Sequence, residues 1–503
     1  MSVQSGTIHN RQLCPGDITT SPLPTLYLAL DRATGEPMHR QIREGLRRAI
    51  LDGRLRPGQR IPSTRALAAE LRVSRLPVLN AYEQLLHEGY LTGRTGSGTF
   101  VSHAVPDELL RPASHPGYQA RAKTREEFER PASTIWHLPA VPFQVGVPAL
   151  DLFPHSAWKK LLVRQVKAES TSQLSYSDPA GFEGLRTSLA EHLRSARAVR
   201  CDDGQVLIVP GSQAALRITA SALLESGDRV AIEEPGYFGA QRAFRASGAD
   251  LVPIPVDQEG LQIGALRKRG RGVRAVYVTP SHQYPLGVTM SVARRFELLE
   301  WASEHDAWII EDDYDSEFRH VSRPIPSLQG MDAHDRVIYA GTFSKSLVPE
   351  VRLGYLVVPP NLWERFYHAR FAFDFFAPTI YQRAIAEFLR DGHFARHLRQ
   401  MRGAYLERRN ALLQGLERHC ARFLTVHNAD AGLHVAVTSS DDIDDVRLVN
   451  RLRRKGLGGL PLSTTYLGPQ RRAGLLLGYG CATPQRLVDA THVLGDLLRR
   501  PGA

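Results

Sequence analysis

The segments EDDYDSEFRH (residues 311–320) and VIYAGTFSKSLVPEVRLGY (residues 337–355) decide the expected fold of most of this chain. Apolar residues 307–310 and 337–340 predict two buried strands. Polar side chains follow each strand, Asp312 and Tyr314 after the first, Lys345 and Arg352 after the second. An open α/β sheet binds its ligands at the carboxyl ends of its strands. The sequence therefore predicts a ligand site containing an acid, a phenol, a lysine and an arginine.

These four groups match the requirements of pyridoxal 5′-phosphate (PLP). A lysine forms a Schiff base with its aldehyde, a carboxylate keeps its pyridine nitrogen protonated, and hydroxyls with an arginine bind its phosphate. Each group alone has an ordinary explanation, because a lysine is usually a solvated charge and Arg352 could pair with an acid of residues 311–317. The spacing and the strand context of the whole set favour PLP.

The same segments resemble the active site of fold-type I aminotransferases, and EDDYDSEF, GTFSKSL and RLGY together are most similar to MocR-type transcriptional regulators. The resemblance implies that Lys345 carries PLP, that Asp312 binds the pyridine nitrogen and that Tyr314 donates to the ring oxygen. It also implies which residues hold the phosphate: Thr342, Ser344 and Arg352.

The expected large domain, residues 136–503, alternates strands and helices. This pattern predicts an α/β fold with a mostly parallel, doubly wound sheet and a small C-terminal α/β domain, as in fold-type I PLP-dependent transferases. Residues 143–154 are expected to begin the domain with a strand. Ser212 and Gln213 open a helix after a strand, so that the free N–H groups there are candidate phosphate contacts.

Four further residues are assigned by the resemblance. It places Tyr237 over the pyridine ring, and it places His282 and Tyr284 near the ring oxygen and a bound ligand. It places Tyr176 on the phosphate of the partner subunit's cofactor, which implies a homodimer.

Residues 36–104 have the pattern of a winged helix. Helical spacing, capping by Ser63 and Ser74, and the segment HEGYLTGRTGSGTFV predict three helices and a two-stranded wing. The region contains eleven arginines, six acidic residues and no lysine, a basic balance that suits double-stranded DNA. It resembles the GntR family, in which the third helix enters the major groove. The predicted DNA contacts are Arg65, Ser74, Arg75, Arg94 and Gly96.

The third helix departs from that family at Leu76-Pro77, where small polar residues are common. Proline is tolerated in a first helical turn, so we expect the helix to form while Leu76 offers only apolar contact. Residues 105–135 contain scattered prolines and mixed charge, which predicts a linker between the two domains.

The composition is that of an ordinary globular protein, with 43% hydrophobic and 23% charged residues in 503. A net charge of +11 suggests an anionic partner. Four cysteines without a CxxC pair predict reduced cytoplasmic thiols, and we expect no metal site. We expect neither a signal peptide nor a membrane segment.

One departure bears on function. Active aminotransferases similar to this chain usually bind the substrate carboxylate through an arginine in a late strand, where this chain has Leu476. A buried leucine cannot hold a carboxylate, and the nearby Arg471 and Arg472 suit a surface loop better. We therefore expect a transcriptional regulator that senses a small amine, an amino-acid-like effector or PLP itself. The alternatives are an active aminotransferase carrying a DNA-binding module and a regulator that has lost the cofactor.

Overall fold

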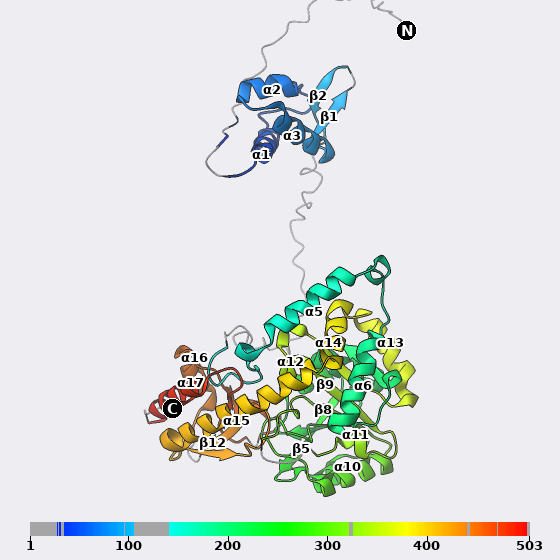
Figure 1. Ribbon diagram of the computed structural model, residues 1–503, viewed down its shortest axis with the longest axis vertical. Helices are drawn as coiled ribbons and strands as arrows, with labels where there is room; N and C mark the ends of the chain where they lie inside the picture. Colours follow the sequence, from blue (N-terminus) through cyan, green and yellow to red (C-terminus); the bar gives the residue numbers. More distant parts are fainter. Residues whose placement is uncertain are drawn as a thin grey trace, which may run out of the picture. The chain divides into compact units, whose positions relative to one another are not determined.

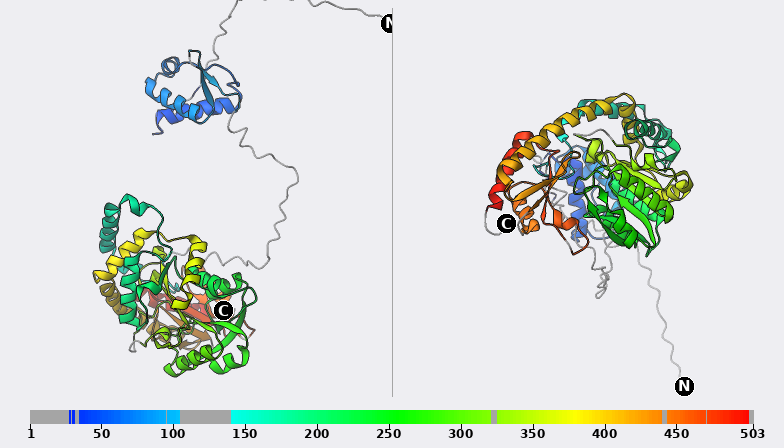
Figure 2. Two further views of the ribbon diagram at one scale, coloured as in Figure 1. Left: turned by 90° about the vertical axis from the view of Figure 1, so that its right-hand side faces the viewer. Right: turned by 90° about the horizontal axis from the view of Figure 1, so that it is seen from below.

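The computed structural model describes residues 28, 30, 31, 35–94, 96–104, 140–320, 325–439, 443–469 and 471–499. The chain forms two compact units, Met1–Glu129 and Arg130–Ala503 (Figures 1 and 2). The predicted linker, residues 105–135, lies outside the described residues. None of the helices in the described part is both long and apolar enough to cross a membrane.

The smaller unit has three helices followed by a two-stranded antiparallel sheet, as predicted. Its elements are α1 (Met38–Leu51), α2 (Thr64–Leu71), α3 (Arg75–His87), β1 (Leu91–Arg94) and β2 (Gly98–Val101). Ser63 caps α2 by accepting a hydrogen bond of 3.2 Å from the backbone N–H of Ala66. Ser74 occupies the equivalent position before α3 without a side-chain capping bond. Pro77 lies in the first turn of α3, where the helix tolerates it.

A compact apolar core holds the smaller unit together. Ile42 and Leu46 of α1, Leu67 of α2 and Val78 and Leu85 of α3 are all fully buried in one cluster. These residues recur at helical spacing, so each helix turns one apolar stripe inward and leaves its polar face to solvent. The polar side chains on the outer faces of the three helices are therefore not needed for the core.

The larger unit is built on an eight-stranded sheet in the order β3-β10-β9-β8-β7-β4-β5-β6. Strands β4, β5, β7, β8 and β9 run parallel, while β10 is antiparallel to both of its neighbours. The bounds are β3 Val206–Val209, β4 Arg229–Glu234, β5 Asp250–Asp257, β6 Gly260–Leu261, β7 Val273–Val278, β8 Trp308–Asp313, β9 Val337–Thr342 and β10 Gly354–Val357.

Helices cover both faces of this sheet. On β8, Ile309 packs in a cluster with Leu298 of α10, while the next residue, Ile310, packs in a cluster with Ile218 of α7 on the opposite face. A strand buried on both faces has a continuous run of apolar residues in its sequence, and the apolar residues 307–310 therefore predicted β8 correctly. The helices are α5 His155–Ala168, α6 Glu183–Arg197, α7 Ser212–Leu223, α8 Phe238–Ala246, α9 Ile263–Arg269, α10 Val292–Glu304, α11 Leu328–Met331, α12 Phe343–Ser346, α13 Trp363–Asp374 and α14 Thr379–Arg390.

A small antiparallel sheet completes the larger unit, in the order β11-β12-β14-β13. In the right-hand view of Figure 2, α15 (yellow to orange) runs past both sheets. The remaining elements are α15 His393–Cys420, β11 Leu424–His427, β12 His434–Ser439, α16 Asp445–Arg454, β13 Leu460–Pro461, β14 Gly474–Gly478 and α17 Pro484–Leu498. The predicted small α/β domain is thus present.

The expected strand over residues 143–154 is wrong. Phe143 forms only an isolated bridge with Gly478, and Leu150–Leu152 is a single 3₁₀ turn. Gly146 has a φ of 79°, outside the range of extended strands. Pro148 and Pro154 lack the N–H groups that a strand would donate to a neighbour.

Candidate functional site

A cavity of about 860 Å³ lies where the carboxyl ends of β7, β8 and β9 meet the small sheet. Thr279 follows β7, Asp312 lies near the end of β8, and Lys345 follows β9; all three line the cavity. The cavity is lined by ten of the predicted cofactor residues: Ser212, Gln213, Tyr237, Tyr284, Asp312, Tyr314, Thr342, Ser344, Lys345 and Arg352.

Lys345 projects from the short helix α12, immediately after β9. Its Nζ donates a hydrogen bond of 2.7 Å to the carbonyl oxygen of Gly146. Gly146 has a φ of 79°, which favours glycine, and a Cβ there would lie 2.9 Å from that Nζ, the movable end of the lysine side chain. Burial and the charge of Arg352 lower the pKa of Lys345, while the carboxylates of Asp315 and Asp312 oppose that shift.

Asp312 offers one oxygen that already has a partner and one that does not. Its Oδ2 accepts a hydrogen bond of 2.7 Å from the hydroxyl of Tyr277. Its Oδ1 is buried without a hydrogen-bond partner in the described structure. Burial raises the pKa of Asp312 to about 6, and the Tyr277 bond and Lys345 work against that rise. A protonated pyridine nitrogen is a donor of the kind that Oδ1 lacks, so the site fits PLP at this end.

The opposite end of the site suits a phosphate. Gly211 precedes α7 with a φ of 86°, and a Cβ there would lie 3.5 Å from the guanidinium of Arg352. The N–H groups of Ser212 and Gln213 open α7, where a helix leaves them free to bind an anion. Arg352 makes no ion pair with any acid in the described part of the chain, so the pairing considered for it with residues 311–317 is absent.

Tyr237 and Tyr284 form an aromatic wall of the cavity. Their rings meet edge to face with centroids 5.4 Å apart, and Gln213 donates a hydrogen bond of 3.2 Å to the Tyr237 hydroxyl. Burial raises the pKa of Tyr237 to about 12, so its phenol stays neutral at physiological pH. A neutral aromatic face beside the cavity is suited to contact with a flat ring.

Two predicted residues do not line the cavity. His282 is 1% exposed and lies behind Tyr314, whose hydroxyl is 3.0 Å from Nδ1 of His282. Tyr176 is 83% exposed, and its ring contacts those of Phe375 and Phe376. The role predicted for Tyr176 involves the cofactor of a partner subunit, so it stays a prediction.

The structure also brings to the cavity residues that sequence reasoning did not identify. Tyr277, Asp315, His434 and Arg453 line it, and the Gly146 carbonyl binds the lysine amine. Asp315 could have been identified from the sequence, because it is an acidic residue only three positions after Asp312, within the segment of residues 311–320. The others come from a strand interior, the small sheet and α16, where nothing in the sequence distinguishes them from core or surface residues.

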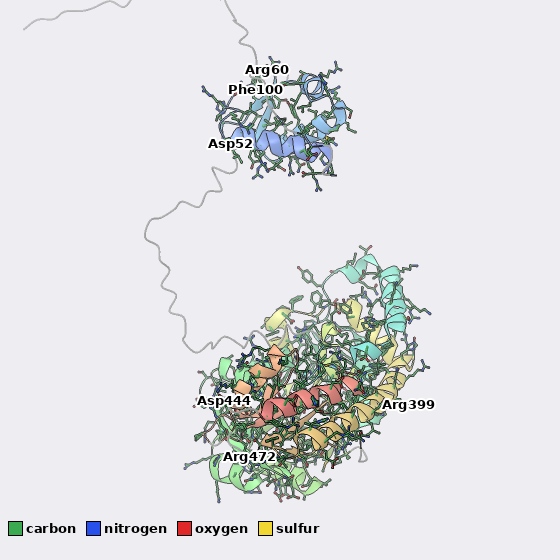
Figure 3. The ribbon with its side chains drawn as sticks, turned by 90° about the vertical axis from the view of Figure 1, so that its left-hand side faces the viewer. Asp52, Arg60, Phe100, Arg399, Asp444 and Arg472 are labelled. Atoms are coloured by element: carbon green, nitrogen blue, oxygen red, sulfur yellow. The ribbon has the colours of Figure 1, made fainter. Side chains whose placement is uncertain are left out.

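Leu476, which occupies the position where related aminotransferases usually carry the carboxylate-binding arginine, lies in the apolar core as expected. Leu476 on β14 is fully buried in a cluster with Tyr284, Ala436 and Leu462, and its side chain does not line the cavity. Arg471 and Arg472 are exposed and do not line it either; Arg472 is labelled in Figure 3. Neither arginine replaces the carboxylate-binding group.

The five predicted DNA contacts are all exposed on the smaller unit. Nε of Arg75 donates a hydrogen bond of 3.2 Å to Oγ1 of Thr64, which connects the starts of α3 and α2. The guanidinium of Arg94 lies over the ring of Phe100, 5.2 Å from its centroid; Phe100 and its bridge partner Arg60 are labelled in Figure 3. Leu76 is 63% exposed at the start of α3, so it adds an apolar group to this surface.

Comparison with known proteins identifies both units. Residues 38–101 match the family described as bacterial regulatory proteins, gntR family, and residues 140–455 match aminotransferase class I and II. The chain is 38% identical over 473 residues to the "Probable rhizopine catabolism regulatory protein MocR" of Rhizobium meliloti, covering 93% of this chain and 95% of that protein. The chain belongs to the MocR-type transcriptional regulators.

A second regulator and a solved aminotransferase support this family assignment. The "HTH-type pyridoxine biosynthesis transcriptional regulator PdxR" of Corynebacterium glutamicum is 32% identical over 91% of this chain and 95% of that protein. The kynurenine aminotransferase of Pyrococcus horikoshii, solved in complex with PMP, superimposes with a TM-score of 0.66 at 29% identity, over 70% of this chain and 89% of that one. This MocR-type chain therefore pairs a DNA-binding GntR module with a domain of a PLP-dependent family.

Proposed function

We propose that this MocR-type regulator binds PLP on Lys345 and uses the cavity around it to sense a small amine or PLP itself. The observation that carries the proposal is the unpartnered Oδ1 of Asp312, buried in the cavity that also holds the Lys345 amine. Leaving such an atom unpaired costs free energy, which a pyridinium N–H would recover. The lowered pKa of Lys345 favours its neutral form, which is the form that reacts with an aldehyde.

The effector is a compound that does not need the usual carboxylate anchor. Leu476, Tyr284 and Leu462 form an apolar cluster where that anchor is expected, and an anion buried against them would have no partner. Of these three residues Tyr284 lines the cavity and the two leucines pack behind it, an environment compatible with an amine that reaches the cofactor or with the arrival of PLP itself. Such a ligand alters DNA binding only through its different affinity for two arrangements of the protein. Residues 105–135 are the proposed connection between the sensor and the winged helix.

The proposal includes a homodimer. Tyr176, Phe375, Phe376 and Phe371 form contacting aromatic rings on one side of the larger unit, and Tyr176 and Phe371 are 83% and 49% exposed. Exposed aromatic groups of this kind favour a protein interface. A second subunit docked there would bring its own Tyr176 toward a neighbouring site.

The test of cofactor binding uses the purified full-length protein with added PLP. We expect a visible absorption band and, after borohydride reduction, a mass increase on the peptide containing Lys345. Both should disappear in Lys345→Ala and persist in Lys160→Ala, which removes an exposed lysine of α5. A wild-type protein that stays colourless and unmodified would contradict the proposal and favour a regulator without cofactor.

The test of sensing uses DNA selected by the protein from a random duplex library. Its affinity for that DNA is then compared with and without PLP, and with a panel of amines and amino acids. We expect at least one of these ligands to change the DNA affinity in the wild type and to leave it unchanged in Lys345→Ala. Repeated turnover of an amino donor without any change in DNA affinity would favour the active aminotransferase instead.

A further inference from the structure

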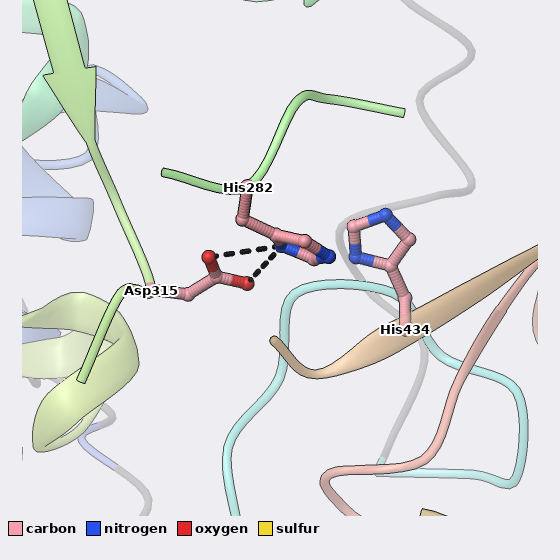
Figure 4. Close-up of side chains that lie close together, drawn as sticks. All are labelled: His282, Asp315 and His434. Atoms are coloured by element: carbon pink, nitrogen blue, oxygen red, sulfur yellow. Dashed lines mark hydrogen bonds and ion pairs between the residues drawn. The ribbon is translucent and has the colours of Figure 1, made fainter. Parts of the chain in front are cut away.

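Three buried side chains from separate elements converge behind Tyr314. His282 comes from the loop after β7, Asp315 from the segment after β8, and His434 from the start of β12 (Figure 4). They are 1%, 3% and 3% exposed. One potential ligand atom from each lies within 4.8 Å of those of the other two. Asp315 and His434 also line the cavity proposed for PLP, but the roles proposed there for Asp312 and Lys345 require none of the three side chains as a ligand of the cofactor.

The hydrogen-bond partners determine which ring nitrogens carry hydrogen. Nδ1 of His282 lies 3.0 Å from both carboxylate oxygens of Asp315, and Nε2 of His434 lies 3.2 Å from the carbonyl oxygen of Pro285. Carboxylates and carbonyls only accept, so these two nitrogens are the donors; the Tyr314 hydroxyl, 3.0 Å from the same Nδ1 of His282, then accepts from it. In the neutral rings the opposite nitrogens, Nε2 of His282 and Nδ1 of His434, therefore present the lone pairs that a metal ion binds.

These two lone pairs face each other without a donor between them. Figure 4 shows Nε2 of His282 and Nδ1 of His434 on the facing edges of the two rings. Nε2 of His282 is buried and has no hydrogen-bond partner among the described residues. A buried acceptor in this state is costly, and a second acceptor opposite it cannot help. A cation satisfies both nitrogens at once.

We propose that His282 and His434 bind a divalent transition-metal ion of the zinc class, with Asp315 holding His282 in position and balancing the charge. Imidazole nitrogen is a preferred ligand of zinc, copper and nickel. Ligating histidines almost always donate their second N–H to a carboxylate or a backbone carbonyl, and Asp315 and Pro285 are such partners. Two nitrogens on one zinc ion lie roughly 3.3 Å apart, so binding draws the two rings closer together.

The cavity gives an ion a route to this site. His434 and Asp315 both line the cavity of about 860 Å³, so an ion can arrive from that side without the core opening. Water, or a donor group of a bound ligand, then completes the coordination from the same side. This inference does not depend on PLP binding, because none of the three residues is assigned to the cofactor by the geometry.

The test measures zinc uptake by the chelator-treated, full-length protein, using equilibrium dialysis and elemental analysis. We expect about one zinc ion per chain more in the wild type than in His434→Gln. His427→Gln is the matched control, since His427 is a half-buried histidine of the same sheet that contacts Thr438 and lies outside the cluster. Asp315→Asn should weaken binding by about 10- to 100-fold, the usual effect of losing such a partner.

A second measurement needs no variant and guards against misfolding. Cobalt(II) added to the wild-type protein should give visible bands typical of nitrogen and oxygen ligands. A strong thiolate charge-transfer band would place the ion on a cysteine and overturn the proposal. It is equally overturned if the wild type takes up no zinc, or if a folded His434→Gln protein takes up as much as the wild type.

Discussion

The hydroxyl of Tyr277 on β7 donates a hydrogen bond of 2.7 Å to Oδ2 of Asp312 on the adjacent strand β8. The bond fixes the carboxylate in the cavity and leaves Oδ1 available to a ligand. It also favours the charged form of Asp312, against the effect of burial. Tyr277 thus acts as a positioning residue for the proposed pyridine-nitrogen partner.

Removing this hydroxyl should weaken cofactor binding. In Tyr277→Phe we expect the pKa of Asp312 to rise further and the affinity for PLP to fall by about tenfold or more, since a hydrogen bond to a charged group contributes about 1.5–3 kcal/mol. The measurement is a titration of apoprotein with PLP by absorbance. The matched control is Tyr339→Phe, which removes a similar buried bond of 2.5 Å to Asp313, outside the cavity. Equal losses in both variants would argue against the assigned role.

The amine of Lys345 should react at lower pH than an ordinary lysine. Burial lowers its pKa, so the neutral, nucleophilic form is populated at lower pH and the rate of covalent PLP attachment should level off there. The carboxylate of Asp315 raises this pKa, and Asp315→Asn should therefore move the midpoint of the rate profile to still lower pH. The check is stopped-flow absorbance across a pH series. A midpoint that moves upward in the variant would contradict the electrostatic argument.

The contribution of Glu233 to the stability of the fold should be lost as the pH rises from about 5 to about 7. Burial raises the pKa of Glu233 from 4.5 to about 7, so the folded state holds a proton that the unfolded state releases within this window. At about 1.4 kcal/mol per pKa unit, this one group, 1% exposed, costs up to about 3 kcal/mol above pH 7. Glu311 shifts in the same direction for the same reason.

Glu233→Gln isolates that contribution. We expect the difference in melting temperature between Glu233→Gln and the wild type to shift in favour of the variant from pH 5 to pH 8, because only the wild type loses the Glu233 contribution. Glu300→Gln, at an exposed position of α10, controls for the loss of a surface charge. Identical pH profiles for Glu233→Gln and the wild type would show that Glu233 does not titrate in this window.

Much of the fold could be predicted because its strands and helix starts are marked by patterns within a few consecutive residues. Strands such as β3 and β8 are buried on both faces and read as apolar runs, while Ser63 marks the start of α2. The cavity residues that follow a strand, such as Asp312 and Lys345, were found for the same reason. His434 and Gly146 were not, because they approach the site from distant parts of the chain. Their relation to it depends on packing between two sheets, which single-sequence patterns do not encode.

Removing the charge of Arg94, in the wing of the smaller unit, tests whether the wing contacts DNA phosphates. Arg94 is exposed, lies over Phe100 and makes no ion pair within the described part of the chain, so its charge is available to a phosphate. In Arg94→Gln we expect weaker binding to all sequences and a slope of log affinity against log salt that is reduced by about 0.9, the value for one lost phosphate contact. Arg54→Gln is the control, because Arg54 already pairs with Asp52 at 3.2 Å and its removal should change the slope less. A change in base preference without a change in salt slope would instead place Arg94 on a base edge.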